Sequence, residues 1–415
     1  MFFLYKIFIN IVLFFSPIII LIRLIKRKED PIRFKEKFSI FTKKKQKGKI
    51  IWFHGASVGE ILSVIPLIQK LEKNKKISQI LVTSNTLSSS KILNNLKLKK
   101  TIHQFYPIDH QYFVNKFLRY WAPTIAIFID SEIWPNMLGS IKRESIPLIL
   151  LNARINKRSF KKWSRLGITV KTLFNKFDLC LPSSHESEKH LRLLGAKNIK
   201  YIGNLKFSES AVNKNILDTN LKKFFLSKKI WCASSTHNKE ELICAIAHKK
   251  LKNKHKNLLT VLIPRHIDRT KKIINQLEKL NLKIHLHNSI DKISKDTDIY
   301  LVNSFGQTES FFKICKTVFI GGSLVKHGGQ NPLEATRYGC KVLHGPHVWN
   351  FDEIYKLLKK NKASNKIMTS NKLVYEVDKM LNNKNNNENF EIKIKDLGNK
   401  ILNSTLNEVN IYIDK

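Results

Sequence analysis

The sequence predicts two doubly wound α/β domains, and three observations support this fold class. From Lys49 onward, apolar stretches of strand length alternate with helical patterns, and such alternation implies a parallel sheet whose ligands bind at the carboxyl ends of the strands. A polar, lysine-rich stretch then interrupts the alternation, and the same alternation resumes after it. We therefore expect an N-terminal domain, a hinge and a C-terminal domain, at residues 26–208, 209–228 and 229–415 respectively.

The composition is that of a globular protein with an unusual charge. A chain of 415 residues with 43% hydrophobic residues is long enough to form two cores. The formal net charge of +42 indicates an anionic partner, such as nucleic acid, an acidic membrane face or a phosphorylated substrate. A drift of the overall composition toward lysine nevertheless explains much of this charge. Five scattered cysteines without a CxxC pair indicate reduced thiols in a cytosol-facing protein and argue against a zinc site or a disulfide framework.

The first 25 residues predict a membrane anchor. The charge-free part, Ile7–Ile22, would span ~24 Å as a helix, and inclusion of Phe2–Tyr5 extends the span to ~31 Å, against a hydrocarbon core of ~30 Å. Twelve Lys or Arg lie between Arg23 and Lys49, and such a cluster favours the cytoplasmic side for the domains that follow. No small-residue cleavage site follows, so we do not expect a removable signal peptide. Both a spanning and an interfacial helix fit this length.

The strands expected in the first domain carry polar residues where they end. The expected strands are Lys49–Phe53, Ile80–Thr83, Thr124–Ile129 and Pro147–Leu151. A helix is expected over Glu60–Lys73, where apolar residues repeat at helical spacing. Glu60 begins this helix after a turn bracketed by two glycines. On its own, Glu60 is most simply a residue that complements the helix dipole.

Carboxylates and an aromatic ring follow the strand that ends at Ile129. The passage Asp130-Ser131-Glu132-Ile133-Trp134-Pro135-Asn136 fits a sugar site, where an aromatic face packs on a pyranose. Arg154 and Arg158 follow the next strand. Arginine suits bidentate pairing with a carboxylate or phosphate, although both arginines also fit a surface.

A glycine-rich loop is the main feature of the second domain. The strands expected there are Ile230–Ala233, Leu258–Ile263, Lys283–Leu286, Ile299–Val302, Thr317–Ile320 and Lys341–Leu343. Two glycine pairs, 321–322 and 328–329, precede an expected helix start with Asn331 as N-cap, Pro332 in the first position and Glu334 in the first turn. Free N–H groups and the helix dipole make such a start a predicted anion site, against the alternative of an ordinary strand-to-helix connection. His266, after another strand, fits either a ligand contact or a core histidine.

The passage GGSLVKHGGQNPLEA, followed by GPHVWNF, resembles the donor-site signature of bacterial Kdo transferases. These enzymes move 3-deoxy-D-manno-octulosonic acid (Kdo) from CMP-Kdo onto the lipid A precursor. The passages SVGE, DSEIWPN, NAR, GNLKF, SSTHNKEE and PRHIDR are similar to motifs of the same family and occur in the family's order. The resemblance implies a GT-B fold, with two Rossmann-like domains facing across a cleft, and covers the chain as far as about Ile354. Asp130, Lys239 and Gln307 differ from the family's usual Glu, Gly and Glu.

The resemblance also implies roles for individual residues. Glu60 would be the general base, and Asp130 and Lys206 would stabilise the transition state of an inverting transfer. The implied CMP contacts are Pro264, Arg265, Phe305, Gly306, Gln307, Asn331, Pro332, Leu333 and Glu334.

Substrates and partners follow from the same resemblance. We expect CMP-Kdo as donor, lipid IVA as acceptor and catalytic domains on the cytoplasmic side of the anionic inner membrane. We expect neither a cofactor nor a metal, because Asp130 and Glu132 adjoin no His or third carboxylate in the sequence. An alternative is another membrane-associated GT-B enzyme that uses a UDP-sugar and a lipid-linked acceptor. Nucleic-acid binding is not expected, because no known module or cluster of base-stacking aromatics is present.

Overall fold

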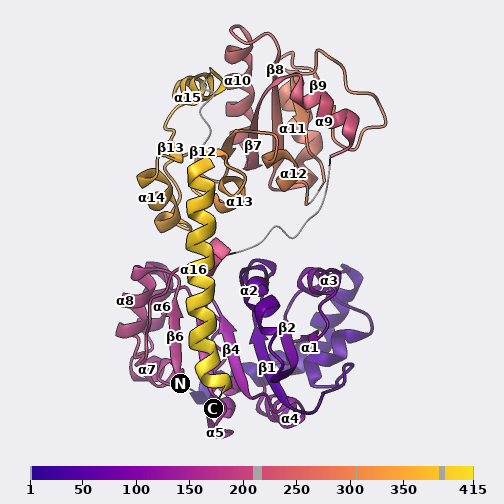
Figure 1. The fold of residues 1–415 in the computed structure, drawn as a ribbon. Coiled ribbons are helices and arrows are strands. Elements are labelled where there is room, and N and C mark those ends of the chain that lie inside the picture. Colours follow the sequence, from indigo (N-terminus) through magenta and orange to yellow (C-terminus); the bar gives the residue numbers. More distant parts are fainter. Residues whose placement is uncertain (1, 209–216, 305, 383–387, 415) are drawn as a thin grey trace. The chain divides into compact units, whose positions relative to one another are not determined.

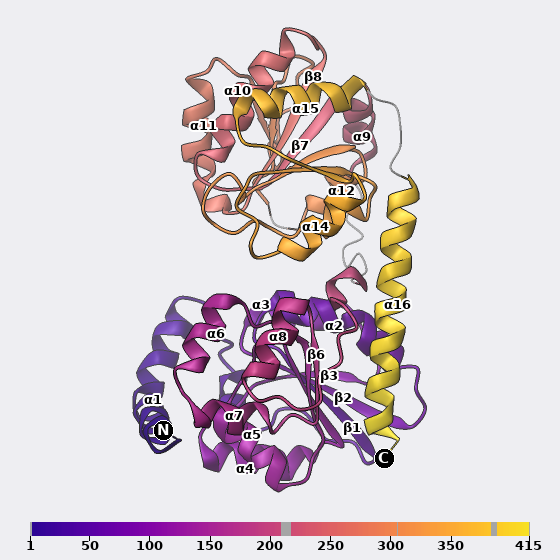
Figure 2. The same cartoon turned by 90° about the vertical axis from the view of Figure 1, so that its left-hand side faces the viewer.

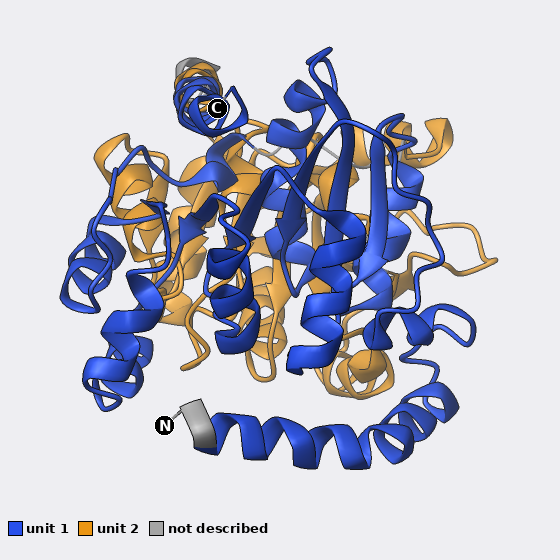
Figure 3. Ribbon diagram, turned by 90° about the horizontal axis from the view of Figure 1, so that it is seen from below, with its two compact units in different colours: residues 1–210, 397–415 blue, residues 211–396 orange. Residues whose placement is uncertain are grey.

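The computed structural model describes residues 2–208, 217–304, 306–382 and 388–414, and the chain forms two compact units. Unit 1 comprises Met1–Ser210 with Leu397–Lys415, and unit 2 comprises Ala211–Asp396 (Figure 3). Each unit contains one parallel sheet with helices on both faces (Figures 1 and 2). The expected fold class, two Rossmann-like domains and an apolar N-terminal helix, is confirmed.

The sheet of unit 1 has the strand order β3-β2-β1-β4-β5-β6. Four of its strands confirm the expected ones, whereas two were not predicted, because β3 contains the buried polar residues His103 and Gln104 and β6 is only four residues long. The strands are β1 (Lys49–His54), β2 (Ile77–Ser84), β3 (Thr101–Phe105), β4 (Ile125–Ile129), β5 (Leu148–Ala153) and β6 (Leu179–Pro182). The α-helices after α1 are α2 (Val58–Leu71), α3 (Leu87–Asn95), α4 (Gln111–Trp121), α5 (Pro135–Arg143), α6 (Lys157–Ser164), α7 (Ile168–Phe174) and α8 (His185–Leu193).

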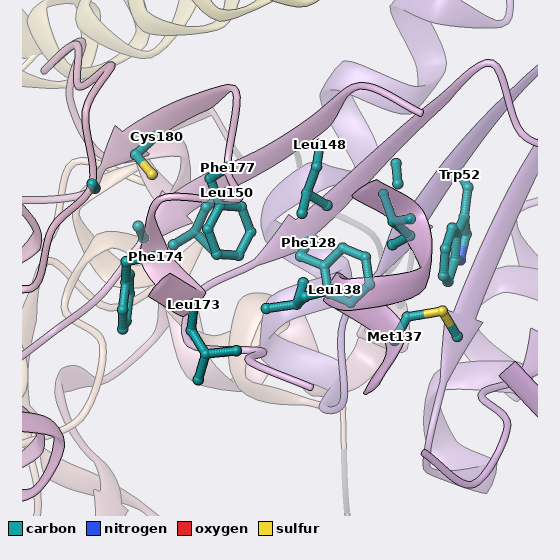
Figure 4. Packing of buried hydrophobic residues seen from close by; sticks show 14 of the residues in the cluster. Trp52, Phe128, Met137, Leu138, Leu148, Leu150, Leu173, Phe174, Phe177 and Cys180 are labelled. Atoms are coloured by element: carbon teal, nitrogen blue, oxygen red, sulfur yellow. The ribbon is translucent and has the colours of Figure 1, made fainter. Parts of the chain in front are cut away.

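One apolar cluster holds the unit 1 sheet against its helices. Trp52 of β1, Phe128 of β4 and Leu150 of β5 contribute fully buried side chains, and Met137 and Leu138 of α5 join the same cluster (Figure 4). Full burial of a side chain of this size contributes roughly 1.5–3 kcal/mol. The close-packed core therefore fixes the positions of the strand ends that follow these residues.

Helix α1 (Phe2–Ile25) is long and apolar enough to cross a membrane. Its 24 residues span roughly 36 Å, which exceeds the expected ~31 Å. Only 17% of its candidate span is buried, and large apolar side chains such as Phe14, which is 77% exposed, point outward. This exposure is not that of a core helix.

Asp109 ties α1 to the segment that begins α5. The Tyr5 hydroxyl donates to Asp109 Oδ2 over 2.6 Å, and the Asp109 carboxylate accepts the backbone N–H groups of Asn136 and Met137 at 3.0 and 2.8 Å. The apolar helix is thereby linked to the DSEIWPN passage through a single buried carboxyl group.

The sheet of unit 2 has the strand order β13-β12-β11-β7-β8-β10-β9. All six expected strands are present, and the three-residue β13 was not predicted. The strands are β7 (Lys229–Thr236), β8 (Leu258–Pro264), β9 (Ile284–Leu286), β10 (Ile299–Leu301), β11 (Thr317–Ile320), β12 (Lys341–His344) and β13 (Ser364–Lys366). The α-helices are α9 (Thr219–Leu226), α10 (Glu240–Lys252), α11 (Thr270–Glu278), α12 (Thr308–Phe312), α13 (Leu333–Thr336), α14 (Asp352–Lys360) and α15 (Ser370–Asn382).

The end of the chain differs from the expected domain boundary. We expected residues 229–415 to form one domain, but Leu397–Lys415, which contains most of helix α16 (Glu388–Ile413), belongs to unit 1. Ile401 and Val409 of this helix are buried, and Lys200 pairs with Glu408 at 2.7 Å. Ile401 packs so closely on Gly203 that a Cβ there would lie 2.7 Å from Ile401 Cδ1. The low-complexity stretch Asn382–Asn389, expected to be a surface loop, lies mostly outside the described residues.

Candidate active site

In unit 1, polar side chains gather where the order of the strands reverses. The chain runs outward from β1 through β2 to β3 and then returns to β4 on the other side of β1. In open parallel sheets, ligands bind at the carboxyl ends of the two strands that flank such a point. His54 ends β1, Asp130 directly follows β4, and Arg154 directly follows β5.

Glu60 lies in the first turn of α2 and completes a capping box with Ser57. Its Oε1 accepts the Ser57 hydroxyl over 2.7 Å, and its Oε2 accepts the Ala56 N–H over 2.7 Å. Burial, as the largest cause, raises the pKa of Glu60 to about 7; the Ser57 hydroxyl opposes this shift, and the carboxylates of Glu132 and Asp130 add to it. Glu60 therefore exchanges a proton near neutral pH, as a general base should.

Asp130 is held in a left-handed backbone conformation with φ of 62°. Its N–H donates to Leu151 O and its carbonyl accepts the Arg154 N–H, so the peptide groups on both sides are fixed by β5 and the residue that follows it. Burial raises the pKa of Asp130, while the positive charges of Arg154 and Lys206 oppose the rise. The structure thus brings these three charged residues into one electrostatic group.

Lys206 comes from the short 3-10 helix Leu205–Ser208, which Asn152 anchors to the sheet. The Asn152 side chain accepts the Leu205 N–H at 3.0 Å, and Asn204 accepts the N–H of Lys206 at 3.0 Å. The predicted stabilisers Asp130 and Lys206 therefore lie at the same edge. Arg158, in contrast, is exposed on α6, where it lines a shallow hollow with other cations.

Glu132, from the passage expected to form a sugar site, lies in a second group with His54 and Tyr106, to which the sequence gave no role. His54 Nε2 lies 3.2 Å from Glu132 Oε2, which also accepts the Trp134 indole N–H at 2.8 Å. Burial would raise the pKa of Glu132, but the hydrogen bond and charge of His54, together with the Trp134 hydrogen bond, outweigh burial and hold that pKa below its usual value. The His54 ring stacks on Tyr106 with centroids 3.7 Å apart. The only signal for this pairing was the position of His54 and Glu132 near two strand ends.

In unit 2 the corresponding reversal lies between β7 and β11. The loop after β11 passes very close to β7, because a Cβ on Gly321 would lie 2.4 Å from the Ser235 carbonyl oxygen. Glu240, at the start of α10, is completely buried beneath this loop. Its carboxylate accepts the backbone N–H groups of His237, Gly322, Ser323 and Leu324 at 2.7–3.0 Å.

These contacts occupy part of the predicted anion-binding loop. In the turn that contains the first glycine pair, the N–H groups of Gly322 and Ser323 already donate to the Glu240 carboxylate. The expected helix start, with Asn331 as N-cap and Pro332 in the first position, is wrong by one residue: α13 begins at Leu333 and Pro332 is its N-cap. The Asn331 Oδ1 still accepts the Leu333 N–H at 3.1 Å. With four residues, α13 carries only a small dipole, although Glu334 does lie in its first turn.

The known proteins most informative about this chain are Kdo transferases. The family model described as 3-Deoxy-D-manno-octulosonic-acid transferase (kdotransferase) matches residues 32–209. The 3-deoxy-D-manno-octulosonic acid transferase of Rickettsia bellii (strain RML369-C) is 32% identical over 372 residues, which cover 89% of this chain and 88% of that protein. The chain belongs to the Kdo transferase family. A probable mitochondrial member from Arabidopsis thaliana is also 32% identical, over 85% of this transferase and 81% of that protein.

Solved structures agree on the fold. A putative UDP-N-acetylglucosamine 2-epimerase from Listeria monocytogenes has a TM-score of 0.61 at 14% identity and covers 88% of the transferase and 97% of its own chain. At this identity the likeness shows the fold alone, which is of the GT-B class. Family membership makes the chain a glycosyltransferase with a role in lipopolysaccharide biosynthesis.

The residues expected to contact CMP lie around the carboxyl edge of the unit 2 sheet. Arg265 and Gly306 are exposed, Gln307, Asn331 and Glu334 are half-buried, and Pro264, Pro332 and Leu333 are buried. Phe305 lies outside the described residues. Because Leu333 has no exposed side-chain surface, a ligand reaches this part of the transferase mainly through its half-buried and exposed neighbours.

Proposed function

We propose that this transferase moves Kdo from CMP-Kdo to lipid IVA with inversion at the anomeric carbon. The observation that carries the proposal is Glu60, a half-buried carboxyl group with a pKa of about 7 at the strand reversal of unit 1. Glu60 takes the proton of the acceptor hydroxyl as the hydroxyl oxygen bonds to the anomeric carbon. The bond from that carbon to the phosphate oxygen breaks, and CMP leaves with the bonding electrons.

Asp130 and Lys206 act on the charges that develop during this step. The anomeric carbon of the donor becomes oxocarbenium-like and gains positive charge, and the negative charge of the Asp130 carboxylate stabilises it. Lys206 faces the negative charge of the leaving phosphate or of the Kdo carboxylate. The positive charges of Lys206 and Arg154 at Asp130 keep that carboxyl more acidic than burial alone would leave it.

The acceptor is proposed to arrive from the inner membrane. Helix α1 is long and apolar enough to cross it, and the basic stretch Arg23–Lys49 suits an anionic cytoplasmic leaflet. Lipid IVA combines acyl chains with phosphates, so its chemistry matches both features. The link from Tyr5 through Asp109 to the start of α5 connects this helix to the edge that carries Glu132.

A transfer assay tests the donor and the acceptor together. Membranes containing the protein are given lipid IVA and freshly generated CMP-Kdo, and the lipid is analysed by mass spectrometry. A mass gain of one or more Kdo units is expected, whereas transfer from a UDP-sugar without transfer from CMP-Kdo would replace this proposal by the alternative one.

Transfer is further expected to need no divalent metal. Among the described residues, no three His, Cys, Asp or Glu side chains are grouped to hold a metal ion, and Lys206 already offers a cation for the leaving phosphate. The same assay with EDTA should give an unchanged rate. Loss of transfer in EDTA, with recovery on addition of Mg²⁺, would contradict metal independence.

A further inference from the structure

Three histidines meet at the carboxyl edge of the unit 2 sheet. His237 follows β7, His266 follows the adjacent β8, and His327 lies in the loop after β11, which pairs with β7 on its other side. The ring centroids of His237 and His327 are 4.0 Å apart, and those of His237 and His266 are 5.7 Å apart. Neither the family resemblance nor the proposed mechanism gives these imidazoles a role.

The hydrogen bonds of His237 define its protonation. The Gln330 amide nitrogen lies 3.2 Å from His237 Nε2, a contact that suits a neutral imidazole whose Nε2 accepts the amide hydrogen. Burial, as the largest cause, and the charges of His327, His266, Arg265 and Arg269 lower the pKa of His237 to about 4.

The two carboxylates at the start of α10, next to His237, are engaged by other groups. Glu240 accepts four backbone N–H groups and is completely buried, and Glu241 is paired with the Arg269 guanidinium at 2.8 and 3.1 Å. The groups that face His237 from the neighbouring strand ends and loop are therefore cations or bases that accept a proton, namely His266, His327, Arg265 and Arg269. Such a group attracts an anion and gains protons as the anion arrives.

We propose that His237, His266 and His327 form the subsite for an oxyanion of the donor, either its phosphate or its sugar carboxylate. The inference rests on the proposed function, because it names the group of CMP-Kdo that the histidines bind. His237 is the central member, since it contacts both other rings. Gly322 leaves room for it: a Cβ there would lie 3.2 Å from His237 Cδ2.

Imidazoles suit this subsite better than fixed cations do. Without ligand, a neutral His237 limits the repulsion from its cationic neighbours. When an oxyanion binds, the imidazole takes up a proton from solvent and donates a charge-assisted hydrogen bond to the oxyanion. Binding is therefore coupled to proton uptake and strengthens as the pH falls toward the unbound His237 pKa of about 4.

The test measures binding to the full-length protein in detergent by calorimetry, with CMP, cytidine and free Kdo as probes. The variants are His237→Gln and His327→Gln, and the control is His285→Gln, on the edge strand β9. We expect wild type and control to bind CMP more tightly than cytidine, and the preference to grow at low pH. If the phosphate is the ligand, both variants lose the preference for CMP by about 10-fold or more. If the carboxylate is the ligand, CMP binding is retained and the affinity for Kdo falls by a similar factor.

Histidine NMR signals provide a readout that misfolding does not imitate. The pKa of His237, about 4 without ligand, should rise when the saturating oxyanion is present. The inference would be overturned if both variants bound CMP and Kdo with wild-type affinity. It would also be overturned if the binding of both ligands did not depend on pH. Neither result would affect the proposed transfer reaction. If the histidine variants lose binding but the wild-type protein transfers no Kdo, the result would instead count against the proposed function.

Discussion

Replacement of Glu60 by Gln is expected to slow Kdo transfer by about 10²–10⁴-fold, the usual contribution of a general base. Glutamine is an accepted partner in a capping box, so α2 should keep its N-terminal turn. The variant therefore removes the proton acceptor and leaves the scaffold. Single-turnover rates with lipid IVA and CMP-Kdo measure the loss, and Glu186→Gln, an exposed first-turn glutamate of α8, is the matched control.

The pH profile of the wild type should identify the same group. Because the base acts in its ionised form, kcat/KM should rise with pH and level off above the Glu60 pKa of about 7. The residual activity of Glu60→Gln should lack this rise. A wild-type rise centred near pH 4.5 would contradict the perturbed pKa, and an unchanged rate in the variant would remove Glu60 from the chemistry.

Glu60→Gln should also change stability, in the opposite direction to activity. When the pKa of a carboxyl group is higher in the folded protein than in the unfolded chain, there is a pH range in which only the folded protein keeps the proton. Stability therefore falls as the pH rises from the ordinary pKa of 4.5 to about 7, and stays lower above that. Glutamine removes this cost, so thermal unfolding at pH 8 should show a variant more stable by roughly 1–3 kcal/mol. Near pH 4 the two proteins should be about equally stable.

The position of Glu60 could be predicted from the sequence, whereas its environment could not. A strand, two glycines and a helical pattern place a carboxylate at a strand end, and the SVGE motif gives it a role. Its pKa is raised first by burial and then by Glu132 and Asp130, which lie 70 or more residues away in the sequence and approach only because β1 and β4 pair. The His54–Glu132 contact has the same origin.

Other differences from the prediction follow from long-range packing. Most of helix α16 belongs to unit 1, where Ile401 and Val409 are buried, and the pattern of the helix does not say which domain buries them. The turn after β11 has the composition of an anion-binding loop, but sequence cannot reveal that the anion is Glu240, about 80 residues earlier. Local patterns therefore identified most of the strands and the glycine-rich loop, and the sheet pairing determined which charges meet.

Replacement of Glu240 by Gln is expected to loosen the loop after β11 and to weaken donor binding. A glutamine side chain offers one acceptor oxygen and one amide group, so two of the four backbone donors at this position would face N–H groups instead of oxygen. Buried donors left unpaired cost about 1–3 kcal/mol each, and we expect a local loss of about 2–4 kcal/mol. Because the two units need not unfold together, hydrogen exchange at Gly322, Ser323 and Leu324 measures this loss better than a single melting curve.

Glu241→Gln is the matched control for this prediction. Glu241 is the next residue of α10 and is also buried, but its carboxylate pairs with the Arg269 side chain and not with the loop. Glu240→Gln should speed exchange of the three loop amides by about 30- to 1,000-fold, the equivalent of 2–4 kcal/mol, and should lower the affinity for CMP. Glu241→Gln should leave these amides protected. Equal protection in both variants would mean that the loop keeps its shape without the buried carboxylate. Its two glycine pairs alone would then suffice to hold His327 and Gln330 beside His237.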